Sequence, residues 1–192
     1  MEDIERKRKS NLPNWLTTFR ILCIPLVVIF LWFPGRLSSF FAALFMGMAF
    51  ITDILDGYFA RKYGAVTALG KFLDPLADKI LVLISMIMLI RLERIPVLIV
   101  IAIIARELAV TGLRSIAVSE GIVIQASLLG KYKTIFQAVA VLGLALHWEY
   151  FNVDFHIVGM LFLWVALVLT IWSGWEYFHQ FSEVLSSKKT YN

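Results

Sequence analysis

Four aspartates interrupt an otherwise apolar part of the chain. Asp53 and Asp56 are three residues apart, and Asp74 and Asp78 are four apart. Residues three or four apart share one face of a helix, so each pair would present two carboxylates on one side of its own helix. Mg²⁺ and Mn²⁺ prefer carboxylate oxygens, and four neighbouring carboxylates repel one another unless cations lie between them. We therefore predict a site for one or two divalent metal ions.

Small residues and one arginine accompany these acids. Gly57, Ala60 and Gly70 remove side-chain bulk, which would let a flat or phosphorylated ligand approach the backbone closely. Helix packing would explain each glycine on its own, so their significance comes from their position within the acidic cluster. The planar guanidinium of Arg61 suits phosphate oxygens. The cluster thus favours a phosphate-containing ligand beside the metal site.

The rest of the chain predicts helices that cross a membrane. Of the 192 residues, 60% are hydrophobic, and the mean hydropathy is +0.80. A spanning helix needs about 20 mostly apolar residues. We predict an all-α, polytopic membrane protein that forms a single domain over residues 1–192, with a short N-terminal juxtamembrane segment. Its six spans would cover residues 16–34, 37–60, 72–91, 95–113, 130–148 and 155–179.

The basic residues predict how these spans are oriented. They are dispersed between apolar stretches, so the net charge of +4 does not indicate nucleic-acid binding. With the N-terminus in the cytoplasm, only Arg36, Arg91 and Arg94 of the 18 lysines and arginines would lie outside, as the positive-inside rule requires. Both termini and the acidic cluster would then face the cytoplasm. Cys23, the single cysteine, excludes a disulfide and is expected to pack within a span.

The acidic cluster also carries a family resemblance. Residues 53–61 read Asp-x-x-Asp-Gly-x-x-Ala-Arg, and after eight further residues the chain reads Gly-x-x-x-Asp-x-x-x-Asp. This resembles the signature of the CDP-alcohol phosphatidyltransferases, with every specified position filled. The resemblance implies a six-helix membrane fold, usually a homodimer. In that fold, metal ions bound by the aspartates hold the diphosphate of a CDP-lipid at the cytoplasmic interface.

Carried over by position, the resemblance assigns roles to these residues. Asp53, Asp56 and Asp74 would bind metal, and we expect two ions, Mg²⁺ or Mn²⁺. Asp78 would be the general base that takes the proton of the acceptor hydroxyl, and it would also contact the second ion. A carboxylate does this efficiently when a nearby cation lowers the pKa of the alcohol. The CDP-lipid would be bound by Asp56, Gly57, Ala60, Arg61 and Gly70.

Three other segments indicate which alcohol accepts the phosphatidyl group. Residues 11–20, 105–114 and 130–137 resemble the corresponding parts of bacterial phosphatidylglycerophosphate synthases, a group within that family. The resemblance implies CDP-diacylglycerol as donor and glycerol 3-phosphate as acceptor. An acceptor that carries a phosphate dianion needs several cations, which we assign to Arg106, Arg114, Lys131 and Lys133. Weaker candidates for the border of the pocket are Thr17, Arg20, Glu107, Thr134 and Gln137.

Other functions remain open at this point. A cardiolipin synthase or a phosphatidylinositol phosphate synthase would keep the aspartates and change the basic residues, and the Lys131-Tyr-Lys133-Thr134 segment argues against both. A small cation transporter is the non-enzymatic alternative. It predicts acids near the middle of a span, whereas these acids cluster at one end of each helix.

Overall fold

In the computed structural model, the described part of the chain forms six helices, in the order that the sequence predicts. It describes the backbone of residues 2–63, 68–119 and 128–190, and the side chains of residues 15, 18–55, 77, 79–119 and 128–182. The predicted all-α fold class is confirmed, because each predicted span coincides largely with one helix. The helices are α1 (Glu2–Trp32), α2 (Arg36–Tyr63), α3 (Ala68–Arg91), α4 (Val97–Ser119), α5 (Leu128–Leu146) and α6 (Phe155–Thr190).

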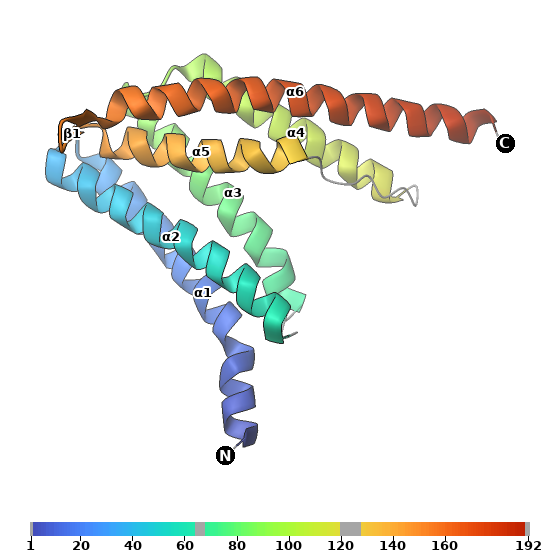
Figure 1. Ribbon diagram of the computed structural model, residues 1–192, viewed down its shortest axis with the longest axis horizontal. Helices are drawn as coiled ribbons and strands as arrows, with labels where there is room; N and C mark the ends of the chain where they lie inside the picture. Colours follow the sequence, from blue (N-terminus) through green and yellow to red (C-terminus); the bar gives the residue numbers. More distant parts are fainter. Residues whose placement is uncertain (1, 64–67, 120–127, 191–192) are drawn as a thin grey trace.

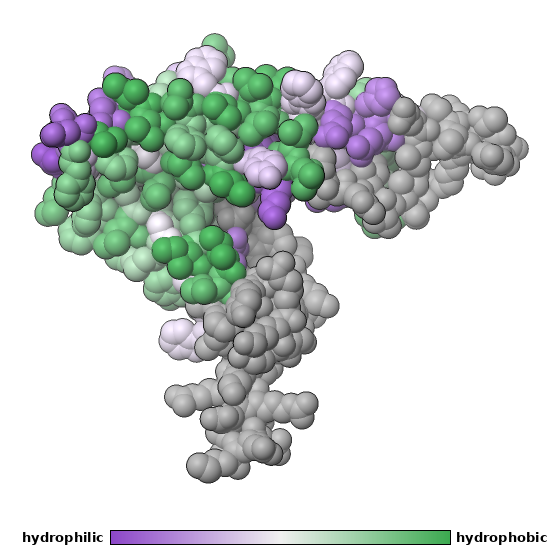
Figure 2. All heavy atoms as spheres, in the orientation of Figure 1, coloured by the Kyte–Doolittle hydropathy of each residue, from purple (hydrophilic) through white to green (hydrophobic). Residues whose placement is uncertain are grey.

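Three of these helices contain stretches long and apolar enough to cross a membrane, so the chain is a helical membrane protein. Within the described residues these stretches are Arg36–Leu55, Leu128–Leu146 and Phe155–Ser182, and a shorter apolar segment covers Thr18–Trp32. Large apolar side chains are exposed along the helices, and Figure 2 shows them as a broad apolar surface. Lipid is the solvent that suits such a surface, because water would oppose its exposure.

Two features of the backbone differ from the prediction. The juxtamembrane segment is not a separate element, since α1 continues through Pro13 without a break. A small hairpin was not predicted: β1 (Glu149–Tyr150) pairs antiparallel with β2 (Val153–Asp154). Phe151 and Asn152 both have positive φ, at 53° and 61°, as the two central residues of a type I′ hairpin turn do. Asparagine followed by glycine is the usual sequence signal of such a turn. Here the first central residue is Phe151, which gives no such signal.

The hairpin lies at one end of the molecule, which we call the hairpin end: the connections 33–35, 92–96 and 147–154. Arg36 donates a 2.7 Å hydrogen bond to the Glu149 carbonyl, and Arg91 donates one of 2.8 Å to the Trp32 carbonyl. Buried Arg94 donates to the Ala145 carbonyl at 2.9 Å, in the last turn of α5. These are the three arginines assigned to the outside, and each one ties two connections or helix ends together.

From the hairpin end the helices diverge in two arms, as Figure 1 shows. One arm contains α1 and α2, and the other contains α5 and α6 with α4 beside them. The shared core lies where the arms meet, and it contains Cys23 as predicted. The last turns of α2 and α4 lie at the other ends of these arms, away from the hairpin end (Figure 1).

The contact between α5 and α6 depends on two facing glycines. A Cβ built on Gly159 would lie 2.7 Å from the Leu144 backbone nitrogen, and one on Gly143 would lie 3.0 Å from the Gly159 Cα. We expect Gly159→Ala to lower the free energy of unfolding by about 1–3 kcal/mol, because the backbones must separate. Thermal unfolding in detergent measures this loss.

Gly112→Ala is the matched control, because a Cβ at that helical glycine meets nothing within 4 Å. Helix propensity alone should make this second variant as stable as the unchanged chain or slightly more stable. Equal unfolding temperatures for Gly159→Ala and Gly112→Ala would show that the glycine contact is not needed.

Candidate active site

The acidic cluster lies far from the hairpin end. Asp53 is 17 residues after the start of α2, or about 26 Å along the helix at about 1.5 Å per residue. Asp56 follows on the same helix, and Asp74 and Asp78 lie in the first half of α3. The side chains of these last three aspartates lie outside the described residues, as do those of the predicted CDP-lipid ligands Gly57, Ala60, Arg61 and Gly70.

Arg20 forms an ion pair with Asp53, the first aspartate of the acidic cluster. Its Nη2 lies 3.0 Å from Asp53 Oδ1, and its side chain is fully buried, whereas that of Asp53 is 40% exposed. A buried guanidinium requires a charge partner, because desolvation without one is costly. Arg20 thus belongs to the acidic cluster, and it is not among the residues that line the basic cavity described below. The side chain of Thr17 lies outside the described residues.

The donor chemistry at this end fits a hard divalent cation. Asp53 supplies carboxylate oxygens on a partly exposed side chain, and these are the ligands that Mg²⁺ and Mn²⁺ take. Among the described side chains no group of three or more His, Cys, Asp or Glu could hold a metal. Of the four predicted ligands only Asp53 has a described side chain, so metal binding by Asp53, Asp56, Asp74 and Asp78 stays a prediction.

A basic cavity of about 250 Å³ lies between α3, α4, α5 and α6. All four cations predicted to bind the acceptor line it, and so do Glu107 and Thr134 from the weaker set. Arg106 lies near the middle of α4, at the tenth position of this 23-residue helix. The full polar lining is Lys79, Arg106, Glu107, Thr111, Arg114, Lys131, Lys133, Thr134, Ser173 and Tyr177.

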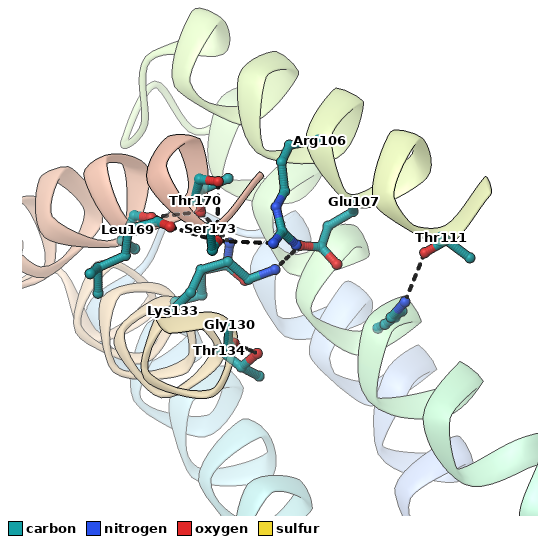
Figure 3. A network of polar contacts seen from close by, with 12 residues as sticks. Arg106, Glu107, Thr111, Gly130, Lys133, Thr134, Leu169, Thr170 and Ser173 are labelled. Carbon is teal, nitrogen blue, oxygen red and sulfur yellow. Dashed lines mark hydrogen bonds and ion pairs between the residues drawn. The ribbon is translucent and has the colours of Figure 1, made fainter. Parts of the chain in front are cut away.

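Glu107 organises two of these cations, as Figure 3 shows. Its Oε1 accepts a hydrogen bond from Arg106 Nη1 at 3.1 Å, and the same oxygen pairs with Lys133 Nζ. The Lys133 side chain is only 4% exposed, so a carboxylate partner is needed to keep its charge stable there. Charge-assisted hydrogen bonds of this kind fix both donors in place. Glu107, which we expected at the border of the pocket, thus lies between Arg106 and Lys133 as their shared acceptor.

The last helix supports the same network. Arg106 Nη2 donates to Ser173 Oγ at 2.9 Å, and Gln137 Nε2 donates to Thr170 Oγ1 at 3.3 Å. Gln137 does not line the basic cavity but borders a smaller void of about 80 Å³ beside it. A Cβ on Gly174 would lie 3.1 Å from Arg106 Cγ, so this glycine leaves room for the arginine.

Four polar residues of this cavity were not predicted: Lys79, Thr111, Ser173 and Tyr177. Lys79 directly follows Asp78, and its Nζ donates to Thr111 Oγ1 at 3.2 Å. Ser173 and Tyr177 come from α6, to which we assigned no chemical role. A signal was present, because Thr170, Ser173 and Tyr177 are spaced by three and four residues and mark one polar face of an apolar helix.

Comparison with known proteins agrees with the motif. The sequence model of the family described as CDP-alcohol phosphatidyltransferase matches residues 10–172, which is most of the chain. The chain belongs to this family. The matched region runs from within α1 to the middle of α6, so it contains the acidic cluster and most of the residues that line the basic cavity. Residues 53–78, which carry the motif, lie inside the matched region.

Curated members of the family are similar over nearly their full length. A CDP-diacylglycerol--glycerol-3-phosphate 3-phosphatidyltransferase of Bacillus subtilis is 44% identical over 193 residues, which covers 92% of this chain and 98% of the relative. Proteins of the same name are 40% identical in Rickettsia bellii, covering 90% and 96%, and 38% identical in Haemophilus influenzae, covering 88% and 92%.

Proposed function

We propose that this CDP-alcohol phosphatidyltransferase transfers the phosphatidyl group of CDP-diacylglycerol to glycerol 3-phosphate, giving phosphatidylglycerophosphate and CMP. The basic cavity is the observation that carries the proposal. Five cationic side chains line it against a single carboxylate, Glu107. The names of the relatives support the same donor and acceptor.

The charge of the cavity favours an acceptor that is itself phosphorylated. A phosphate dianion can pair with several cations at once, and guanidinium groups such as those of Arg106 and Arg114 match its oxygens. A neutral polyol or zwitterionic serine would leave most of these cations without a counter-charge. Glu107 already pairs with Arg106 and Lys133, so a phosphate would supply counter-charge for the other cations of the lining. About 250 Å³ also suits a small acceptor better than a second phospholipid.

In the proposed reaction, the acceptor hydroxyl oxygen attacks the phosphorus that carries the diacylglycerol. A new phosphorus–oxygen bond forms, the bond to CMP breaks, and Asp78 takes the hydroxyl proton. Arg61 would stabilise the negative charge on the departing CMP. Gly57, Ala60 and Gly70 would admit the CDP portion close to the backbone.

The metal site is part of the proposal. Asp53, Asp56, Asp74 and Asp78 would hold two ions, Mg²⁺ or Mn²⁺, and the half-exposed Asp53 beside Arg20 has suitable donor chemistry. Such ions supply charge neutralisation for the diphosphate and a lowered pKa for the acceptor alcohol. Arg20 would limit repulsion within the cluster and keep Asp53 in place.

We also propose a place in the cell: six spans in the cell membrane, with both termini and the active site cytoplasmic, in a homodimer. The grouping of Arg36, Arg91 and Arg94 at the hairpin end supports the orientation, because nearly all other lysines and arginines then fall on the opposite side. The homodimer rests on the family resemblance.

CMP release by the purified protein tests the function. Detergent-solubilised protein would receive CDP-diacylglycerol and Mg²⁺ with one acceptor at a time: glycerol 3-phosphate, inositol phosphate, serine or phosphatidylglycerol. We expect release with glycerol 3-phosphate alone, and loss of release when EDTA replaces Mg²⁺. Release with a different acceptor would support the phosphatidyl transfer but show that the basic cavity does not select glycerol 3-phosphate. No release with any acceptor would favour the cation-transport alternative.

A further inference from the structure

Tyr177 contributes a polar group to the basic cavity that the described residues leave unpaired. Its side chain lines the cavity and is only 5% exposed. The hydroxyl oxygen is buried and has no hydrogen-bond partner among the described residues. Buried hydroxyls are almost always paired, because burial without a partner forfeits their hydrogen bonds to water. A ligand in the cavity would supply the missing partner.

The surroundings of Tyr177 indicate what kind of ligand that is. The Arg114 guanidinium carbon lies 5.8 Å from the centroid of the Tyr177 ring, so this cation lies near the ring. Ser173, one turn earlier on α6, holds Arg106 through its hydroxyl. Tyr177 therefore lines the same cavity as Arg106 and Arg114. A neutral phenol in such a setting is a hydrogen-bond donor for an anionic oxygen.

We propose that Tyr177 is a specificity-determining residue whose hydroxyl donates a hydrogen bond to the phosphate of the acceptor. This inference rests on the proposed function and adds a residue of α6 to the acceptor site. The arginines and lysines supply charge, which any small anion satisfies. Tyr177 supplies a directional donor at a fixed place, which favours a phosphate bound at one position in the cavity.

Tyr177→Phe removes only the hydroxyl and keeps the ring near Arg114. We expect its KM for glycerol 3-phosphate to rise about tenfold, because a hydrogen bond to a charged group is lost. Its KM for CDP-diacylglycerol should stay unchanged. Tyr132→Phe is the matched control, since that tyrosine is 52% exposed and does not line the cavity. This control should leave both KM values unchanged.

Thermal unfolding with added glycerol 3-phosphate, without CDP-lipid, gives a readout that does not need turnover. The acceptor should stabilise the unchanged chain and Tyr132→Phe, and a roughly tenfold higher concentration should be needed for Tyr177→Phe. Equal stabilisation of all three, or an unchanged KM for glycerol 3-phosphate in Tyr177→Phe, overturns the assignment of Tyr177. If the unchanged chain itself neither binds glycerol 3-phosphate nor uses it, the proposed function fails and the inference fails with it.

Discussion

Replacing Asp78 by asparagine is expected to lower kcat by about 10²- to 10⁴-fold, the range that a positioned general base contributes. The asparagine keeps the shape of the side chain but cannot accept the proton of the acceptor hydroxyl. Binding of the CDP-lipid should be largely retained, because three carboxylates remain for the metal ions. CMP release with glycerol 3-phosphate measures the first effect, and binding of CDP-diacylglycerol in the presence of Mg²⁺ measures the second.

Asp56→Asn distinguishes loss of metal binding from loss of the general base. Asp56 is assigned to the metal and to the CDP-lipid, so this variant should bind the lipid more weakly and need more Mg²⁺ for what binding remains. Full activity in Asp78→Asn would remove it as the base. If both variants lost lipid binding to the same degree, Asp78 would be a metal ligand without a separate role in proton transfer.

Lys133→Ala is expected to raise the KM for glycerol 3-phosphate by about 10²-fold, while the KM for CDP-diacylglycerol changes little. Lys133 is buried at 3% exposure and pairs with Glu107, so its removal takes a desolvated charge from the cavity. Truncating one member of a buried charge pair costs about 3–5 kcal/mol, part of which appears as lost stability. Initial rates with each substrate varied separately measure the two KM values.

A double-mutant cycle with Glu107 shows whether the pair acts as one unit. Glu107→Gln alone leaves Lys133 and Arg106 without their shared carboxylate, so it should also weaken acceptor use. The double variant should lose less than the two single losses combined, because the residues contact each other directly. Equal rises in both KM values would place Lys133 at the CDP-lipid instead, and purely additive losses would contradict the coupling.

The helices were predictable because membrane spans carry a strong and local signal. The ranges 130–148 and 155–179 agree closely with the start of α5 and α6, since long apolar runs bounded by polar residues leave few alternatives. The β1–β2 hairpin was missed because it is only two residues long on each side and turns at Phe151–Asn152. The continuity of α1 was not predicted, because the polar N-terminal residues were expected to form a juxtamembrane segment apart from the first span.

The site was predictable where charge interrupts an apolar span. Arg106, Glu107 and Lys133 were singled out because they are charged and lie in segments that carry the family resemblance, and all three line the basic cavity. Ser173 and Tyr177 were missed because a serine or a tyrosine in an apolar helix carries little signal until its neighbours in space are known. The partner of Arg20 was hidden for a similar reason, since it lies 33 residues away on another helix.

The proposed transfer to glycerol 3-phosphate can be followed by labelling this acceptor and measuring its entry into lipid. Purified protein with CDP-diacylglycerol and Mg²⁺ would receive glycerol 3-phosphate labelled in its carbon atoms and, separately, in its phosphate. We expect both labels to enter one chloroform-extractable lipid, in equal amounts to each other and to the CMP released. A lipid that carries neither label, formed while CMP is released, would contradict the proposed transfer.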